Sequence, residues 1–315
     1  MSILPIDHGI FASSGAGGFI GFMYMAGGNT GSSSSVVDKF AFADDSRTTL
    51  GTGLSSARRD LGGAGDAGVA GYVAGGGYYY DTVDKFAFAD DSRTTLSTGL
   101  SSARFGLAGC SNSGTAAYMG GGSTNAFSPS AAVTTVDKFA YSDDSRSTLG
   151  TGLSVGRWML AAAANSGVAG YWAAGNSAGG AQTTVDKFAF SDDSRSTLGT
   201  GMSAYKTSVA GAANSGVAAY FAGGSSYTDV VTKFAFSDDS RSLLSTGLAV
   251  ATSMMAGAAN SGTAVYFAGG NSNTTTYLDT MEKFAVADDS RSVISSALSV
   301  ARRGMAGASN EGSLA

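Results

Sequence analysis

Short stretches in which apolar and polar residues alternate recur along the whole chain, separated by Gly, Asn, Asp and Ser. One copy shows the pattern. A small, glycine-rich stretch at 208–213 leads through an Asn-Ser-Gly turn into a second stretch at 217–222, and further stretches follow at 230–236 and 243–248. A period of two residues, bounded by turn residues, predicts four β-strands. No window has the period of an amphipathic helix, so repeats built from helix pairs are excluded.

This four-strand pattern occurs six times. Each copy contains a Lys-Phe pair, with the phenylalanine at Phe40, Phe86, Phe139, Phe188, Phe234 and Phe284. Each continues into Asp-Asp-Ser-Arg, whose aspartates we interpret as structural turn residues: Asp44, Asp45, Asp90, Asp91, Asp143, Asp144, Asp192, Asp193, Asp238, Asp239, Asp288 and Asp289. Six units of four strands predict an all-β, six-bladed β-propeller with one antiparallel sheet per blade. Small first-strand residues would suit the crowded axis, and the phenylalanines and fourth-strand leucines would fill the wider gaps between blades.

The two ends of the chain each resemble part of one unit. Residues 301–312 repeat the beginning of a unit, and residues 19–28 look like a second strand with its Gly-Gly. We therefore expect the C-terminal strand to complete the first blade, which closes the ring and hides its edges. On this interpretation residues 1–18 form an N-terminal arm and residues 19–315 form the propeller.

Composition narrows the classes of function. The 19 Lys and Arg residues are scattered and outnumbered by 24 Asp and Glu, so no basic stripe is available for nucleic acid. Cys110 is the only cysteine and His8 the only histidine, which excludes an internal disulfide and a Cys/His metal cluster. We expect no metal and no cofactor. No apolar run reaches the roughly 18 residues of a membrane-spanning helix, and residues 1–10 contain no Lys or Arg, so no signal peptide is predicted.

Several of these features resemble the kelch repeat over nearly the whole chain. They are the Gly-Gly after the second strand, the Val-Asp-Lys-Phe third strand and the Arg that begins the next unit. The tryptophan usual in the fourth kelch strand is a leucine here, as at Leu50, Leu149 and Leu198. The turn at 191–198 is similar to the Asp-box of sialidase-like propellers, which is a structural turn. The Ala/Gly-rich copies with Gly-Tyr-x-Ala-Gly-Gly are similar to repeats in structural proteins of tailed bacteriophages, including cyanophages.

The resemblances do not lead to a catalytic site, and we predict no catalytic residues. A kelch-like galactose oxidase would imply copper held by two His and two Tyr, whereas the chain has one His. A sialidase-like site would need arginines around the axis, whereas the arginine of each Asp-Asp-Ser-Arg is expected at the rim. Trp158 and Trp172 are expected in the core, on the first and second strands of one blade, and Cys110 is expected to be buried.

Two interpretations of the Asp-Asp turns are open. Adjacent carboxylates could bind calcium. Alternatively one Asp caps backbone N–H groups while the arginine pairs with the other Asp, and we favour this structural interpretation. Lys39 and its equivalents are interpreted as solvent-facing, beside Asp38.

The antiparallel order sorts the connections onto two faces. The 1–2 and 3–4 turns, nearly constant in sequence, lie on one face; the 2–3 and 4–1 loops lie on the other. The 2–3 loops differ in length and content: 29–35, 77–81, 122–134, 176–183, 225–229 and 271–279. Loops on a rigid scaffold often carry recognition, although these loops could also simply be unconstrained. The candidate binding residues are Tyr78, Tyr79, Tyr80, Asn125, Phe127, Tyr227, Asn273 and Tyr277.

The repeats predict a non-catalytic structural or adhesive module, and the resemblance to phage structural proteins implies a component of a phage tail or baseplate. The expected location is the virion, after synthesis in the host cytoplasm. The expected partners are other virion proteins and a host-surface glycan or protein, within a homo-oligomer or symmetric assembly, without nucleic acid or membrane insertion. The alternatives are a cellular kelch-like interaction module and a carbohydrate-active propeller enzyme.

Overall fold

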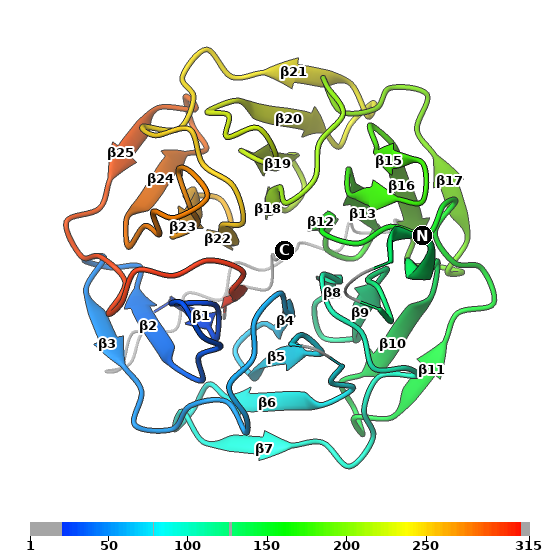
Figure 1. Cartoon of the computed structure of the whole chain (residues 1–315), viewed down its shortest axis with the longest axis horizontal. Coiled ribbons are helices and arrows are strands. Elements are labelled where there is room, and N and C mark those ends of the chain that lie inside the picture. The colour runs from blue at the N-terminus through cyan, green and yellow to red at the C-terminus, as the bar shows by residue number, and fades with distance from the viewer. Residues whose placement is uncertain (1–20, 78, 126–127, 310–315) are drawn as a thin grey trace, which may run out of the picture.

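The computed structural model describes residues 21–77, 79–125 and 128–309. These residues form six four-stranded antiparallel sheets arranged around a central axis (Figure 1). The sequence prediction of an all-β, six-bladed propeller is therefore confirmed. Blade 1 contains β26, β1, β2 and β3, so the C-terminal strand completes the blade that the N-terminal part of the chain begins.

In every blade the first two strands lie near the axis and are almost wholly buried. The first strands are β26 (Ala306–Ser309), β4 (Gly62–Asp66), β8 (Ala108–Asn112), β12 (Ala161–Asn165), β18 (Ala210–Asn214) and β22 (Ala256–Asn260). The second strands are β1 (Phe22–Ala26), β5 (Ala70–Ala74), β9 (Ala116–Gly120), β13 (Ala169–Ala173), β19 (Ala218–Ala222) and β23 (Ala264–Ala268).

The outer two strands lie between the core and the rim. The third strands are β2 (Val37–Ala41), β6 (Val83–Ala87), β10 (Val136–Ala140), β16 (Val185–Ala189), β20 (Val231–Ala235) and β24 (Met281–Ala285). The fourth strands are β3 (Arg47–Thr49), β7 (Arg93–Thr95), β11 (Arg146–Thr148), β17 (Arg195–Thr197), β21 (Arg241–Leu243) and β25 (Arg291–Val293). The 2–3 loops add the short strands β14 (Asn176–Ser177) and β15 (Gly180–Ala181) and one 3-10 turn, η1 (Pro129–Ala131).

The fourth strand is shorter and earlier than predicted. We expected a strand at 243–248, but β21 ends at Leu243, after pairing only with residues 232–234 of β20. Leu248 is buried in the blade 5 to blade 6 gap although it lies in the connection beyond the strand. The apolar pattern therefore identified a core residue correctly and assigned it to the wrong element.

Close approach of the first strands explains their glycines. A Cβ on Gly257 would lie 1.9 Å from the carbonyl oxygen of Gly211 in the preceding blade, and a Cβ on Gly307 would lie 1.9 Å from that of Gly257. Real Cβ atoms do not approach backbone oxygens this closely, so a side chain here would force the blades apart. The expectation that only small residues fit at the axis is confirmed.

Each blade is also tied to the next through the second aspartate of the Asp-Asp turn. Asp144 accepts hydrogen bonds from Lys85 Nζ at 2.8 and 2.9 Å and from the Tyr72 hydroxyl at 2.6 Å, both in the preceding blade. Equivalent contacts join all six pairs of neighbouring blades, and Lys283 with Asp45 closes the ring between blades 6 and 1 at 3.0 Å.

These contacts correct two sequence interpretations. The first aspartate of each turn does cap a backbone N–H, as Asp143 does for Ser145 at 3.0 Å. The turn arginine, however, lies near the third strand of its own blade: Arg146 Nη1 is 3.6 Å from Asp137. Lys39 crosses the gap to Asp91, at 2.9 Å, instead of facing solvent beside Asp38. Neighbouring blades are about fifty residues apart in sequence, so local spacing did not reveal these pairs.

A fully buried ion pair anchors four of the connections that enter a blade. Arg104 Nη2 lies 2.8 Å from Asp137 Oδ2, and both side chains are inaccessible to solvent. The same oxygen accepts hydrogen bonds from the backbone and hydroxyl of Ser101, both at 2.9 Å. Burial raises the pKa of Asp137, but the charge of Arg104 and the hydrogen bonds outweigh it and hold the pKa below its usual range. The equivalent pairs are Arg302 with Asp38, Arg58 with Asp84 and Arg157 with Asp186.

Blades 5 and 6 lack this pair. Lys206 and Thr232 take its place in blade 5, and Thr252 and Glu282 in blade 6. Burial raises the pKa of Glu282 above its usual value. Its nearest recorded cation is the rim residue Arg291, at 3.8 Å.

We expect Asp137→Ala to lower the free energy of unfolding by about 3–5 kcal/mol, because Arg104 would remain buried without a counter-charge. Urea denaturation measures the change. Glu282→Gln is the matched control and should cost much less, since the arginine of the other blades is a threonine there. Equal losses for the two variants would contradict this account of the buried pair.

Gly257→Ala should lower the free energy of unfolding by about 1–3 kcal/mol, because the added methyl group overlaps the Gly211 carbonyl. Gly199→Ala is the control, since a Cβ at that exposed position meets nothing within 4 Å. Thermal melts of the two variants, compared with the parent protein, provide the measurement. A melting temperature unchanged in Gly257→Ala would show that the first strands can separate without cost.

Candidate functional site

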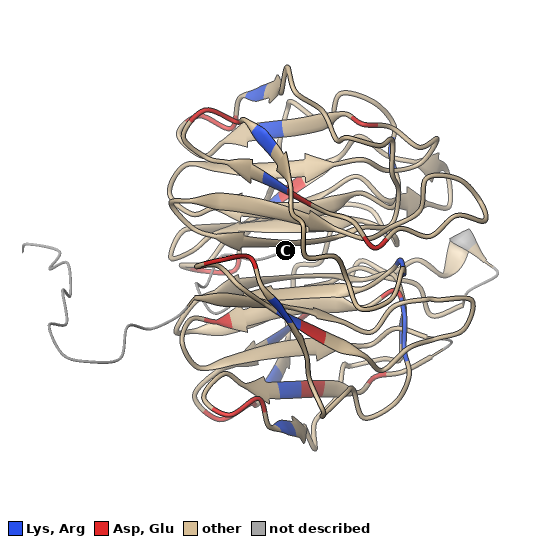
Figure 2. Ribbon diagram, turned by 90° about the vertical axis from the view of Figure 1, so that its left-hand side faces the viewer, with Lys and Arg blue, Asp and Glu red and all other residues tan. Residues whose placement is uncertain are grey.

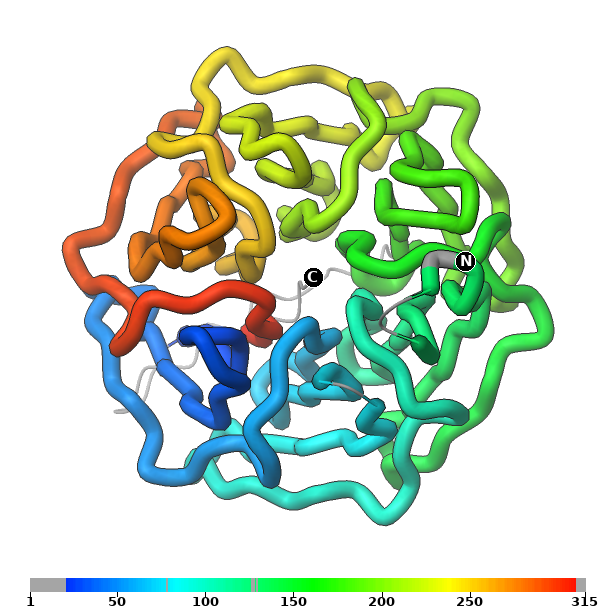
Figure 3. The backbone as a smooth tube through the Cα atoms, in the orientation of Figure 1, coloured from blue at the N-terminus to red at the C-terminus, as the bar shows by residue number. Residues whose placement is uncertain are grey.

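The connections open onto two unlike faces of the disc. Figure 2 shows acidic turns gathered along one face, at the left of the view. The 2–3 loops and the long 4–1 connections lie on the opposite face, which we call the loop face. Figure 3 shows one such connection, in red, running from the rim of blade 6 across blade 1 to the axis.

The constant sequence of the other face is explained by contacts between blades. The turn residue Asn165 accepts a hydrogen bond from the backbone of Gly216 in the next blade at 2.9 Å, and Ser166 N–H donates to the Ser215 hydroxyl at 3.0 Å. Blade 2 begins this series with Asp66, and the described part of it ends with Asn214 bonded to Gly262. The Asn-Ser-Gly turns are therefore parts of the scaffold.

Some of the predicted binding residues are exposed on the loop face. Tyr79 and Tyr80 in the blade 2 loop are 48% and 38% exposed, and Tyr79 has a φ of 136°. Asn125 in the blade 3 loop is also exposed. Tyr78 and Phe127 lie outside the described residues.

The structure brings three other predicted residues together, between the loops of blades 5 and 6. The Asn271 amide donates to the Tyr227 hydroxyl at 3.3 Å and to the backbone oxygen of Asn273 at 2.6 Å. The Arg303 guanidinium lies 5.3 Å from the centre of the Tyr277 ring. Both tyrosines are only partly exposed: Tyr227 links the two loops, whereas Tyr277 packs against Arg303 of the following connection. The predicted set is thus divided between blades 2 and 3 and blades 5 and 6, on opposite sides of the ring.

The most exposed aromatic residue of the described chain was not predicted. Tyr205 is 72% exposed in the connection between blades 4 and 5. The other five copies have alanine or glycine at this position: Ala57, Ala103, Gly156, Ala251 and Ala301. A large residue in one copy where the others are small is a signal that comparison of the repeats could have found.

Trp158 was assigned to a first strand, which is wrong. It lies in the connection that precedes β12, where its backbone pairs with Asn176 and its ring packs edge-on against Phe105 at 5.3 Å. Apolar residues continue from Trp158 into β12, so the sequence pattern did not show where the strand begins. Trp172 is on β13 and Cys110 on β8, both buried as expected.

A closed ring of backbone hydrogen bonds surrounds the axis where these connections meet. Each member donates its N–H to the carbonyl of the equivalent residue in the preceding connection, at 2.7 to 3.0 Å. The last link is Asp60 N–H to Gly304, which joins the two ends of the propeller. All members have φ between 52° and 63°. They are Asp60, Gly106, Met159, Ser208, Met254 and Gly304.

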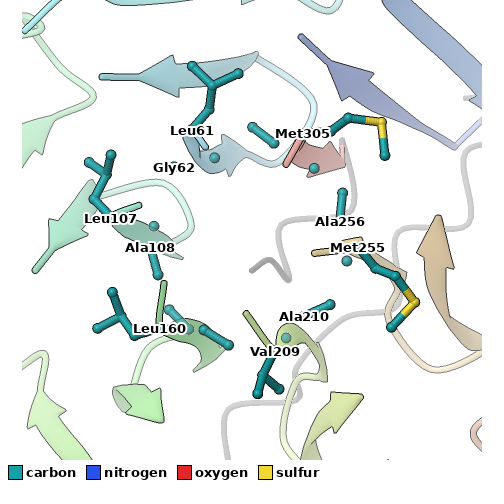
Figure 4. Close-up of a pocket in the computed structure, with 18 residues that line it drawn as sticks. Leu61, Gly62, Leu107, Ala108, Leu160, Val209, Ala210, Met255, Ala256 and Met305 are labelled. Atoms are coloured by element: carbon teal, nitrogen blue, oxygen red, sulfur yellow. The ribbon is translucent and has the colours of Figure 1, made fainter. Parts of the chain in front are cut away.

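This ring encloses the loop-face end of the axial channel, which we call the axial mouth. Its cavity measures about 60 Å³ and is lined by the six ring residues and the aliphatic or methionine residues that follow them. Figure 4 shows Leu61, Leu107, Leu160, Val209, Met255 and Met305 arranged around the channel.

Asp60 is the charged residue of the axial mouth. Its Oδ2 lies 3.6 Å from Arg59 Nε, and its Oδ1 lies over Gly304, 2.5 Å from the position a Cβ would take. Burial raises the pKa of Asp60 to about 6, although the charges of Arg59 and Arg303 oppose the shift. A carboxyl group with this pKa is partly protonated near neutral pH.

Neither a metal cluster nor a membrane-spanning helix is present in the described part of the chain. It contains no group of three or more His, Cys, Asp or Glu placed to hold a metal ion. At the Asp-Asp turns the second carboxylate already binds a lysine and a tyrosine, which are contacts that calcium would have to displace. No helix among these residues is long and apolar enough to cross a bilayer.

Comparison with known proteins gives the fold. No family model matches the chain, and no curated protein matches its sequence. Among solved structures the fold is similar to that of YjhT, with a TM-score of 0.66 and 15% sequence identity over 87% of this chain and 97% of that chain. Identity this low shows a shared architecture alone, which is the six-bladed β-propeller.

Proposed function

We propose that this protein is a non-catalytic β-propeller that holds a partner on its loop face, as a component of a phage tail or baseplate. The observation that carries the proposal is that the two faces of the disc differ in the contacts that their residues make. Residues on the constant face are engaged in contacts between blades, whereas the loops of the other face differ from copy to copy and expose Tyr79, Tyr80 and Tyr205.

The exposed loop residues suit binding to a protein or a glycan. Tyrosine combines a flat apolar ring with a hydroxyl group and is enriched at protein interfaces. The loop that carries Tyr79 and Tyr80 is held at its base by the buried Arg58, which donates hydrogen bonds to the backbone oxygens of Gly75 and Thr82. A partner would therefore meet prearranged side chains, which lowers the entropic cost of association.

The axial channel supports a role without catalysis. Its loop-face cavity of about 60 Å³ is small beside the roughly 300–1,000 Å³ of ordinary small-molecule sites. Asp60 is the single ionisable residue lining that cavity in the described chain, so it has no second acid or base to work with there.

The assignment to a phage particle is supported by the resemblance of the Ala/Gly-rich repeats to those of phage structural proteins. It is also consistent with a ring in which every neighbouring pair of described blades is joined by an ion pair. A cellular interaction module would use the same geometry, and the location of the protein separates the two roles.

Particles purified by density gradient from lysates of cells that carry the gene should contain the protein in a fixed ratio to the major capsid protein. Quantitative mass spectrometry measures that ratio, and antibody labelling in electron micrographs should place the protein on the tail or baseplate. Its absence from washed particles, with abundant protein in the soluble fraction, would refute the virion role.

Particles carrying Tyr79→Gly together with Tyr205→Ala should adsorb to host cells at least tenfold more slowly, because both exposed rings are lost from the loop face. Glycine accepts the φ of 136° at position 79, so folding should be preserved. Val168→Ala, an exposed change on the constant face, is the control. Normal adsorption by the tyrosine variant would count against recognition through these rings.

A further inference from the structure

The ring at the axial mouth carries backbone strain that glycine would remove. Met159 and Met254 have φ of 52° and 58°, in the left-handed region that residues with a side chain rarely adopt. Glycine occupies two equivalent positions, Gly106 and Gly304, where it meets the same geometry without strain. The chain therefore keeps side chains at the other positions at a cost in stability, and strain of this kind clusters at functional sites.

Asp60 occupies an uncrowded place in this ring. Its two neighbours around the axis are Gly304 and Gly106, and neither has a side chain to cover the carboxylate. Arg59 Nε, at 3.6 Å, is beyond hydrogen-bond distance, and the Arg303 guanidinium stacks on Tyr277. A half-buried carboxylate whose nearest cation is 3.6 Å away gains from a ligand that donates a direct, charged hydrogen bond.

The rest of the lining specifies the shape and polarity of such a ligand. Within the described residues, Ser208 is the other polar side chain of the mouth cavity, and the remaining side chains are leucine, valine and methionine. A cavity of about 60 Å³ has no room for a sugar ring or a nucleotide. It has room for a compact ammonium group on an aliphatic stem, because such stems pack well on apolar surfaces while the charge binds at a polar rim.

We propose that the axial mouth binds the ammonium group of a lysine side chain from a partner protein. Asp60 is its counter-ion, Ser208 accepts a second hydrogen bond, and the thioethers of Met159 and Met254 pack against the methylene stem. Methionine suits this role because its flexible side chain adapts to different contacts. The inference rests on the proposed function in one respect, since it names the chemistry of a partner on the loop face.

The ionisation of Asp60 predicts how binding depends on pH. The charged groups that face it are the guanidinium groups of Arg59 and Arg303, and the pH dependence is assigned to Asp60. Ammonium binds the carboxylate and not the neutral acid. Affinity should therefore be constant above about pH 7 and fall up to tenfold for each pH unit below about 6.

The experiment titrates purified protein, labelled with ¹³C at its methionine methyl groups, with n-butylammonium chloride at pH 7.5. The methyl signals of Met159 and Met254 should shift and saturate with a millimolar dissociation constant. The neutral isostere 1-butanol should bind at least tenfold more weakly. Asp60→Asn should weaken butylammonium binding at least tenfold, and Asp279→Asn, which removes an exposed carboxylate of the same face, should leave it unchanged.

A second variant separates binding from a structural role. Glycine fits the backbone at both methionine positions, so Met159→Gly with Met254→Gly should keep or raise the melting temperature while weakening butylammonium binding several-fold. Equal affinity for butanol and butylammonium, unchanged affinity in Asp60→Asn, or affinity independent of pH between 5 and 7 would overturn the proposal. If Asp60→Asn does not fold, the pH titration of the parent protein decides. Because no particle is involved, absence of the protein from virions would refute the proposed function and leave this result standing.

Discussion

Aspartate carboxylates join each of the six nearly identical sheets to its neighbour, across gaps filled by buried apolar side chains. The second aspartate of every Asp-Asp turn is bound by a lysine and a tyrosine of the preceding blade, and Lys283 with Asp45 extends this contact across the point where the chain ends meet. The partly buried setting makes each pair stronger than an ion pair in open water. The repetition of Asp-Asp, Lys-Phe and the second-strand tyrosine is a direct consequence of this arrangement.

The same constraint divides the molecule into a fixed face and a variable one. Residues that bind the neighbouring blade, such as Asp144 and Ser166, cannot change without loss of a partner in the preceding sheet. The 2–3 loops bond to the neighbouring connections through backbone atoms, as Asn271 does with Ser253, which leaves their side chains free to diverge. The axial ring belongs to neither class: its backbone is the same in all six copies, while its side chains range from none to methionine and aspartate. The backbone of the axial mouth is therefore six-fold symmetric, whereas its side chains are not.

The fold was predictable because strand alternation and repeat spacing are local properties of the sequence. They indicated the number of blades, the order of strands and the closure by the C-terminal strand. The partners of Lys39 and Arg104 were not predictable in this way, because packing between sheets decides them and the sequence separations are large. The site was harder still. Nothing about methionine as a residue type indicates that Met159 adopts a left-handed backbone, and Asp60 gains its raised pKa only from the closed ring around it.

Unequal anchoring of the connections has a consequence for motion at the axis. The connections that supply Asp60, Gly106, Met159 and Gly304 are each held by a buried arginine, whereas those that supply Ser208 and Met254 carry Lys206 and Thr252 at that position. Segments with fewer buried attachments open more easily. The side of the opening that carries Asp60 should therefore be rigid and hold the carboxylate in place. The side that carries Ser208 and Met254 should be more flexible and able to adjust to a bound group.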